Sequence, residues 1–437
     1  MQKCFNGIFL IPFFIIPFSI FAQQSSVSPY SRLGFGDVQP QIYTRALGMG
    51  GANIALVEPL NINNSNPASY SSLGLTTFEV GLQFGLIEQK QLNPDVTLNN
   101  NISGIRYFAI GVPVKKWWGS AFGLQPYSFK GYSIATQRTG PEDILIYDQF
   151  SGNGGLSKVY WGNGFTVAEG LSIGVNAAYI FGNLEEENNI LWSNGFYASR
   201  IFENAKVNGL RFDFGARYVY EIDENRDFAL GLTFANKTKL STTVDHYAFV
   251  TSSNGVSIDT LDNINGYQSD LVLPNEFGLG FTYGRKTDKS INYAWAINGD
   301  VHFYQGSTFE NFDGEMNLMD GLRFEVGALI TPGLTFTKDN RLSYFELIEY
   351  RLGGFYENTP YSVGGTQLKD YGITIGFGLP IRARNLAPGE QKNTMVNIGA
   401  VLGRRGSLDN GLIQESYLNL YLGLTLNDKW FNKIKYR

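Results

Sequence analysis

Three arginines on strand-like segments are the side chains best suited to binding chemistry. Arg211, Arg217 and Arg323 share a face with glycines and with the carboxylates of Asp213 and Glu325. A guanidinium donates two parallel hydrogen bonds to a carboxylate, so an inward arginine would suit the acidic group of a ligand. The same arginines would also suit internal pairing with Asp213 and Glu325. The sequence leaves both interpretations open, and these five residues form the candidate ligand-binding set.

Residues for catalysis or metal binding are scarce. The chain has two histidines, His246 and His302, and one cysteine. It shows no phosphate-binding loop and no EF-hand calcium loop. By strand parity His302 shares a face with Asp300. This arrangement is more typical of a hydrogen-bonded interior cluster than of a catalytic relay. We therefore expect no enzyme, no metal site and no cofactor.

The composition indicates an ordered chain with unusual apolar content. Of 437 residues, 17% are charged, 15% are aromatic and 51 are glycine. Disordered chains have few aromatics and a high net charge, so disorder is excluded. The formal net charge of −5 gives no basic footprint for nucleic acid, and we expect no nucleic-acid partner.

The N-terminus has the pattern of an export signal. A short positive start at Lys3 precedes an apolar run that ends at Ala22 and contains Pro12 and Pro17. This predicts a cleavable signal peptide over residues 1–22, because two prolines disfavour the alternative of a membrane-spanning helix. No later run approaches the length of a transmembrane helix. A membrane protein of this sequence would therefore be a closed β-barrel.

Apolar residues alternate with glycine or polar residues along much of the chain. In Thr77–Ile87 the even positions are apolar, while the odd positions are glycine or polar. The same pattern recurs at Asn208–Tyr220, Asp320–Ala328, Tyr371–Ile381 and Leu418–Leu424. Alternation of period two predicts strands with one apolar face. A soluble sandwich also alternates, but its polar face carries Lys, Glu and Thr freely. A face dominated by glycine favours a crowded barrel lumen.

Fourteen such segments lie between residues 73 and 427, an even number as in bacterial outer-membrane barrels. The third, fifth and seventh connections, at about 131–153, 184–205 and 239–272, are long and are expected as outer loops, whereas the intervening connections are tight. The predicted fold is all-β: a single 14-stranded antiparallel transmembrane β-barrel. We expect an integral protein of a Gram-negative outer membrane, in contact with its lipid.

Residues 23–72 carry no barrel pattern and contain many Gly, Ser, Asn and Pro residues. Fourteen strands lie between the eight of a side-chain-filled barrel and the 16–18 of an open porin, so the lumen needs a filling. We expect this segment to be an N-terminal plug inside the lumen. The alternative is a disordered periplasmic leader. The segment has an apolar set that a leader would not need, namely Leu33, Phe35, Ile42, Tyr43, Leu47, Met49, Ile54 and Leu56.

Two motifs in this segment resemble a known family. The run Arg45–Leu56, with Gly48, Gly50 and Gly51, is followed by the triplet Asn66-Pro67-Ala68. Together they resemble the N-terminal signature of FadL/TodX-type outer-membrane transporters. The opening at 28–34 resembles a large branch of the same superfamily. The resemblance implies that residues 23–72 form a hatch, and that the barrel binds hydrophobic molecules and releases them sideways at a kinked third strand.

The expected third strand carries Gly119, Gly123 and Pro126. A proline inside a strand removes a ladder hydrogen bond, so these residues are candidates for a lateral opening; an ordinary strand end is the alternative. The chain departs from the family in its last residues, 428–437, which are basic and aromatic. This tail is expected in the periplasm, either solvated or in contact with the membrane or a partner protein.

Two functions are consistent with these expectations. The leading hypothesis is passive uptake of a hydrophobic, fatty-acid-like small molecule through a hatch-gated lumen. The alternative is a PorV-like barrel that serves as a subunit or docking platform of an outer-membrane protein secretion or assembly complex. An apolar pocket that reaches an arginine would favour uptake, whereas a lumen sealed by paired charges would favour the protein partner.

Overall fold

The computed structural model describes residues 27–428, apart from 194, 196, 253–255, 286–292, 313, 315–317, 334–343, 382–393 and 410. The predicted signal peptide lies outside the described residues, as does the predicted tail after its first residue. Over these described ranges, no helix is both long enough and apolar enough to cross a bilayer.

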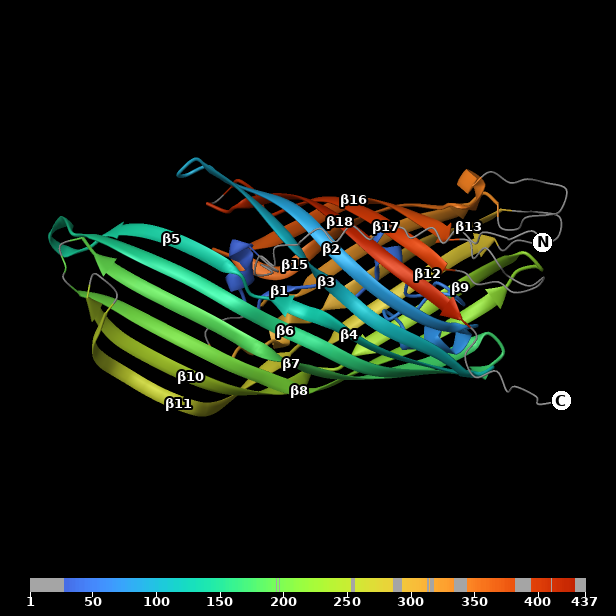
Figure 1. Cartoon of the computed structure of the whole chain (residues 1–437), viewed down its shortest axis with the longest axis horizontal. Coiled ribbons are helices and arrows are strands. Elements are labelled where there is room, and N and C mark those ends of the chain that lie inside the picture. The colour runs from blue at the N-terminus through green and yellow to red at the C-terminus, as the bar shows by residue number, and fades with distance from the viewer. Residues whose placement is uncertain are drawn as a thin grey trace, which may run out of the picture.

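Fourteen strands form a closed antiparallel barrel, in which β18 pairs with β2 to complete the wall (Figure 1). Each of the fourteen predicted segments overlaps one of these strands, so the predicted fold class is confirmed. The strands are β2 (Thr76–Gln91), β3 (Val96–Lys115), β4 (Trp118–Phe129), β6 (Leu145–Ala168), β7 (Leu171–Trp192), β8 (Tyr197–Glu221), β9 (Arg226–Ala235), β12 (Glu276–Arg285), β13 (Ala294–Tyr304), β14 (Gly321–Thr331), β15 (Glu349–Val363), β16 (Thr366–Ile381), β17 (Thr394–Arg405) and β18 (Gln414–Asp428).

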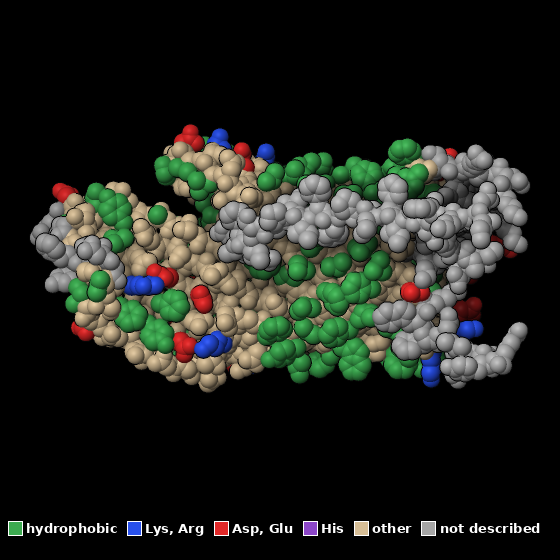
Figure 2. All heavy atoms as spheres, in the orientation of Figure 1, with side chains coloured by type: hydrophobic (Ala, Val, Ile, Leu, Met, Phe, Trp, Pro, Cys, Tyr) green, Lys and Arg blue, Asp and Glu red, His purple; other side chains and the backbone are tan. Residues whose placement is uncertain are grey.

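The two faces of each strand differ as the alternation predicts. On β8, Leu210 and Phe212 are 59% and 42% exposed on the outside, while Arg211 between them is 2% exposed on the inside. Figure 2 shows hydrophobic side chains gathered over the barrel wall. Because every backbone group in a closed wall finds a partner in a neighbouring strand, this apolar outer surface suits lipid.

The two ends of the barrel differ. Tight turns at 116–117, 169–170 and 222–225 mark one end, called here the proximal end. At the opposite, distal end, some strands continue past the barrel as an open sheet (Figure 1). This distal sheet has the order β5-β6-β7-β8-β10-β11. Its strands β5 (Tyr132–Thr139), β10 (Thr238–Ser252) and β11 (Ser257–Leu273) continue β4, β9 and β12 respectively.

The distal sheet corrects one expectation. The connections at about 131–153, 184–205 and 239–272 were expected as outer loops, but most of their residues form strands. Strands β6, β7 and β8 have 24, 22 and 25 residues, whereas about 9–11 residues cross a bilayer. Neighbouring extensions satisfy one another's backbone groups, so segments that would be loops alone become one ladder.

Residues 27–75, called here the N-terminal segment, lie within the barrel (Figure 1). Met49, Ile54 and Tyr70 are fully buried there. The segment contains η1 (Pro29–Arg32), β1 (Asp37–Val38), α1 (Thr44–Leu47) and η2 (Pro67–Ser72). Three further short helices lie in connections of the barrel: η3 (Pro141–Asp143), η4 (Gly306–Thr308) and η5 (Tyr344–Leu347).

Candidate functional site

The glycine face of the barrel packs on the backbone of the N-terminal segment. A Cβ at Gly119 would overlap the Tyr70 carbonyl, and a Cβ at Gly327 would overlap the Met49 carbonyl. A glycine in a strand allows such close approach of a second backbone. Further barrel glycines in this role are Gly164, Gly174, Gly231 and Gly353. The glycines therefore make room for a chain segment rather than for an open channel.

The glycines of the predicted hatch motif lie at the other side of these contacts. Gly48 packs against Gly376, and the amide of Gly50 donates to Thr374 Oγ1 over 2.7 Å. Gly50 and Gly51 have φ angles of 73° and 105°, a left-handed conformation that favours glycine. The motif thus forms a tight turn held against β14, β15 and β16.

The triplet Asn66-Pro67-Ala68 begins η2 and ties it to the barrel. Asn66 Oδ1 accepts the amide of Ala68 over 3.0 Å, while its Nδ2 donates to the carbonyls of Ile54 and Ala216. Proline suits the first position of a helix because its missing N–H would be unpaired there. Pro67 and Ala68 are both buried. One asparagine therefore caps the helix and fixes it to β8.

Tyrosines connect the segment to the wall. Tyr43 stacks on Tyr107 with ring centroids 3.9 Å apart, and its hydroxyl lies 2.6 Å from the Tyr160 hydroxyl. Burial raises the pKa of Tyr43 well above its ordinary value, so the phenol stays neutral. Tyr30 donates to the Ile413 carbonyl, and burial raises the pKa of Tyr30 to about 12.

Arg211 and Asp213 of the candidate ligand-binding set meet in a balanced cluster. Arg211 Nη2 lies 2.9 Å from Glu276 Oε1, and its Nη1 donates to the Tyr127 hydroxyl over 2.8 Å. Lys158 Nζ donates to Asp213 Oδ2 over 3.0 Å, and Arg211 Nε lies 3.7 Å from Asp213 Oδ1. Two cations thus face two carboxylates, which leaves no charge for a ligand to neutralise.

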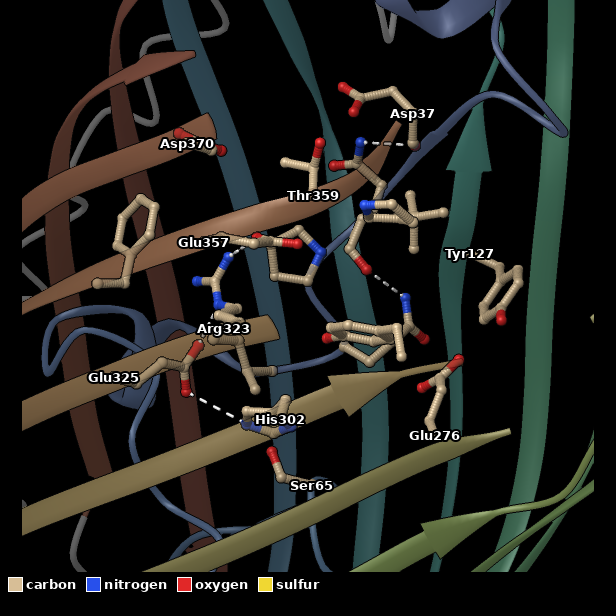
Figure 3. A pocket seen from close by; sticks show the side chains of 18 of the residues that line it. Asp37, Ser65, Tyr127, Glu276, His302, Arg323, Glu325, Glu357, Thr359 and Asp370 are labelled. Atoms are coloured by element: carbon tan, nitrogen blue, oxygen red, sulfur yellow. Dashed lines mark hydrogen bonds and ion pairs between the residues drawn. The ribbon is translucent and has the colours of Figure 1, made fainter. Parts of the chain in front are cut away.

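Arg323 and Glu325 are also brought together (Figure 3). Arg323 Nε donates to Glu325 Oε1 over 2.6 Å, and Nη1 donates to Glu357 Oε2 over 2.8 Å. The guanidinium carbon lies 4.4 Å from the centre of the Phe355 ring. For Arg211 and Arg323, the geometry follows the internal-pairing interpretation rather than the ligand-anchor interpretation.

Arg217 stands apart from the other two arginines. Its side chain is buried, and Nη1 donates to the carbonyl of Leu56 over 3.2 Å. Its Nε has no hydrogen-bond partner, and over the described ranges no carboxylate forms an ion pair with it. Of the three predicted anchors, Arg217 is therefore the one whose charge remains uncompensated, but it lies beneath the N-terminal segment.

Other ion pairs were missed in the sequence. Arg405 Nη1 donates to Asp37 Oδ1 over 2.6 Å, and its Nε donates to Glu415 Oε2 over 2.8 Å. Arg45 Nη2 donates to Glu349 Oε2 over 2.9 Å. Strand parity would have placed the barrel residues of these pairs on the inner face. The partners Asp37 and Arg45 lie in a segment without periodicity, which gives no signal for a pair.

A cavity of about 320 Å³ lies between the N-terminal segment and the wall (Figure 3). Its lining includes apolar side chains such as Phe35 and Leu47, but charged groups are numerous. The carboxylates are Asp37, Asp213, Glu276, Glu325, Glu357, Asp370 and Glu415, and the cations are Lys158, Arg211, Arg323 and Arg405. Such a lining combines apolar surface with charged groups, several of which pair with one another.

The residues predicted to form a lateral opening lie on β4, and the pairing of this strand changes along its length. The β3–β4 ladder stops distally at Phe108 and Leu124. Beyond that point β3 registers with β2 alone, while β4 registers with β6 and, through Ser128 and Val38, with β1 of the N-terminal segment. Pro126 lies in this seam. Gly119 and Gly123 lie in the paired part of β4, where Gly123 faces the ring of Tyr160.

Comparison with known proteins gives a family and a fold. The family model described as BamG matches residues 3–437. A Pseudomonas aeruginosa FadL homologue has a TM-score of 0.54 at 12% identity, over 91% of this chain and 100% of that chain. The P. putida toluene transporter TodX has a TM-score of 0.53 at 12% identity, over 90% and 99% of the two chains.

The Ralstonia pickettii toluene transporter TbuX has a TM-score of 0.51 at 11% identity, over 88% of this chain and 98% of that chain. No curated protein matches the sequence. At these identities the solved structures show the fold. The barrel is of the FadL type, as the sequence motifs indicate.

Proposed function

The chain belongs to the BamG family and has a FadL-type barrel fold, and on this premise we propose that it is a docking subunit of an outer-membrane complex. The N-terminal segment closes its lumen as a hatch. The distal sheet is the surface that binds a protein partner of a secretion or assembly complex. The proximal end, with its tight turns, faces the periplasm, and the distal sheet stands outside the bilayer.

The open distal sheet is the observation that carries this proposal. Among the described residues, its edge strand β5 registers with β6 alone. Within the same part of the chain, the other edge strand, β11, registers with β10 and otherwise makes one isolated bridge, between Val272 and Glu310. Strand edges present backbone donors and acceptors that pair readily with another chain. An edge of this length outside a barrel favours a protein partner over a small molecule.

Exposed apolar side chains on the same edge strand support the binding of a protein partner. Ile258, Leu261 and Ile264 of β11 are 53%, 64% and 45% exposed, and the adjacent Val256 is 65% exposed. These residues lie beyond the barrel wall, so lipid does not account for their exposure. Large apolar side chains exposed together commonly mark protein contacts.

Contacts inside the barrel support the proposal that the N-terminal segment closes the lumen. The segment contacts the wall through backbone, and its Asp37 and Arg45 form ion pairs with barrel residues. Displacing it would break these partly buried pairs, and about 3–5 kcal/mol, the cost when a fully buried pair loses one partner, is the upper bound for each. A barrel that works as a platform needs no such displacement. We propose no catalytic role.

A hydrophobic-compound channel is the second candidate. The solved neighbours include toluene transporters, and the β3–β4 seam at Pro126 lies where lateral release would occur. In this function the uncompensated Arg217 would bind an acidic group of the cargo. Passage requires the pairing of Val38 with Ser128 to open, because β1 covers the seam.

Site-specific photo-crosslinking in cells tests the proposed function. A photoreactive amino acid replaces Leu261 of β11, and a matched probe replaces Leu352, which is 63% exposed on β15 of the barrel wall. We expect the Leu261 probe to yield a discrete protein adduct and the Leu352 probe to yield lipid adducts only. A distal probe without any protein adduct would contradict the docking role.

A further inference from the structure

Three potential metal ligands meet on the inner face of β13 and β14. Asp300 and His302 alternate on β13, and Glu325 of β14 stands directly opposite Asp300 in the register. One ligand atom from each side chain lies within 4.8 Å of the other two. His302 Nε2 is 3.5 Å from Glu325 Oε2, the contact drawn in Figure 3.

Two buried carboxylate oxygens in this cluster make no hydrogen bond, although Glu325 Oε2 lies 3.5 Å from His302 Nε2. Asp300 Oδ2 accepts the amides of Asn53 and Ile54 over 2.6 and 2.8 Å, but Asp300 Oδ1 has no hydrogen-bond partner. Glu325 Oε1 accepts Arg323, but Glu325 Oε2 has no hydrogen-bond partner. Asp300 is 2% and Glu325 is 4% exposed. Buried polar atoms are normally satisfied, so these two oxygens call for a partner.

The negative charge of the cluster also favours the binding of a cation. Its carboxylates are Asp300, Glu325 and the neighbouring Glu357, and among the described residues the guanidinium that pairs with them is that of Arg323. In the protonation state that binds a metal, with a neutral imidazole and three ionised carboxylates, three negative charges and one positive charge would leave a net charge of −2. A divalent cation would balance this charge and satisfy both free oxygens.

We propose that Asp300, His302 and Glu325 bind a divalent transition-metal ion, with Zn²⁺ as the reference cation. One imidazole and two carboxylates match the ligand preference of Zn²⁺ and similar ions, whereas Ca²⁺ and Mg²⁺ prefer oxygen ligands alone. His302 also lines the lumen cavity, so the ion can be reached from the cavity. The remaining coordination positions are filled by water from that cavity.

The ion would act as a latch for the N-terminal segment. Asp300 contacts the amides of Asn53 and Ile54 with one oxygen and would hold the metal with the other. Metal binding therefore fixes the carboxylate that holds residues 53–54 against β13. This inference stands independently of the proposed docking function, because it concerns the inner face of the barrel and not the distal sheet.

Zinc binding to the purified full-length protein in detergent tests the site. The protein is stripped with a chelator and titrated calorimetrically with Zn²⁺, and bound metal is counted by elemental analysis. We expect one Zn²⁺ per chain, and we expect His302→Gln to weaken binding by at least ~10-fold. The matched control is His246→Gln, which removes the other histidine, 3.1 Å from Glu203, and should leave binding unchanged.

Folding of each variant is checked by its heat-dependent shift in gel mobility. If His302→Gln does not fold, Asp300→Asn provides the same comparison. A wild-type protein that binds no Zn²⁺ would overturn the proposal. Equal binding by wild type and the folded site variant would overturn it as well, as would equal competition by Mg²⁺.

Discussion

The α-carbon of Gly327 lies against the carbonyl of Met49, so that no side chain fits between β14 and the N-terminal segment. The relationship joins two features that look unrelated in the sequence, the glycines of the alternating strands and the glycine-rich N-terminal run. Glycine occurs in both features because the two backbones approach each other so closely. The glycine face of the barrel therefore packs directly against the N-terminal segment.

Replacing Gly327 by valine should loosen the packing of the N-terminal segment against β14. The added side chain would overlap the Met49 backbone, and overpacking of this kind costs about 1–3 kcal/mol. We expect the free energy of unfolding in urea to fall by the same amount. We also expect a protease to cleave residues 27–75 faster. The control is Gly104→Val, because a Cβ there meets no atom within 4 Å. Equal behaviour of the two variants would show that the segment is not seated on the glycines.

Arg211→Ala should destabilise the barrel. The change leaves the Glu276 carboxylate, which is 35% exposed, without its guanidinium and leaves Asp213 with Lys158 alone. Because Glu276 is partly solvated, we expect a cost below that of breaking a fully buried pair, which is about 3–5 kcal/mol. Equilibrium unfolding in lipid measures the loss. The control is Arg226→Ala, which breaks an exposed pair with Asp223 and should have no measurable effect. Similar stability of both variants would contradict a structural role for Arg211.

Phe214→Lys tests which surface meets lipid. Phe214 points outward from β8 at 45% exposure, and a lysine facing lipid near the midplane costs about 2–4 kcal/mol. The free energy of folding into lipid vesicles measures this cost. Leu261→Lys is the control, since Leu261 is more exposed, at 64%, but lies on the distal sheet. Equal tolerance of both lysines would contradict the assigned lipid band.

A disulfide across the seam separates the two candidate functions. Val38 and Ser128 are register partners between β1 and β4, and the native cysteine, Cys4, lies in the predicted signal peptide. The double variant Val38→Cys, Ser128→Cys should therefore crosslink on oxidation. We expect association with a protein partner to survive the crosslink. A loss of function that appears only when the disulfide is formed, and that reduction reverses, would instead favour lateral passage of a small molecule through the seam.

Much of the barrel could be predicted because alternation acts along one strand at a time. The order of Phe212, Asp213 and Phe214 is enough to assign inside and outside. The distal sheet escaped prediction because its strands depend on neighbours. Residues 184–192 become strand where β6 and β8 lie beside them, and residues 197–205 become strand where β7 and β10 lie beside them.

The candidate site was predicted only in part, for a related reason. Parity assigns Arg323 and Glu325 to the inner face, but it does not give the distance between them or reveal Glu357 as a third partner. The same limit applies to His302, since free oxygens on Asp300 and Glu325 become visible only once the side chains are placed.

The most direct test of the docking account is purification from native membranes after removal of the distal edge. Thr243 and Gln268 are register partners in the β10–β11 hairpin, so residues 244–267 can be replaced by a two-residue Asn-Gly turn, a type that closes such a hairpin. We predict a stoichiometric protein partner with the full-length chain and its loss from the shortened, folded barrel. A full-length chain that carries a hydrophobic molecule in its lumen and no protein partner would contradict the account.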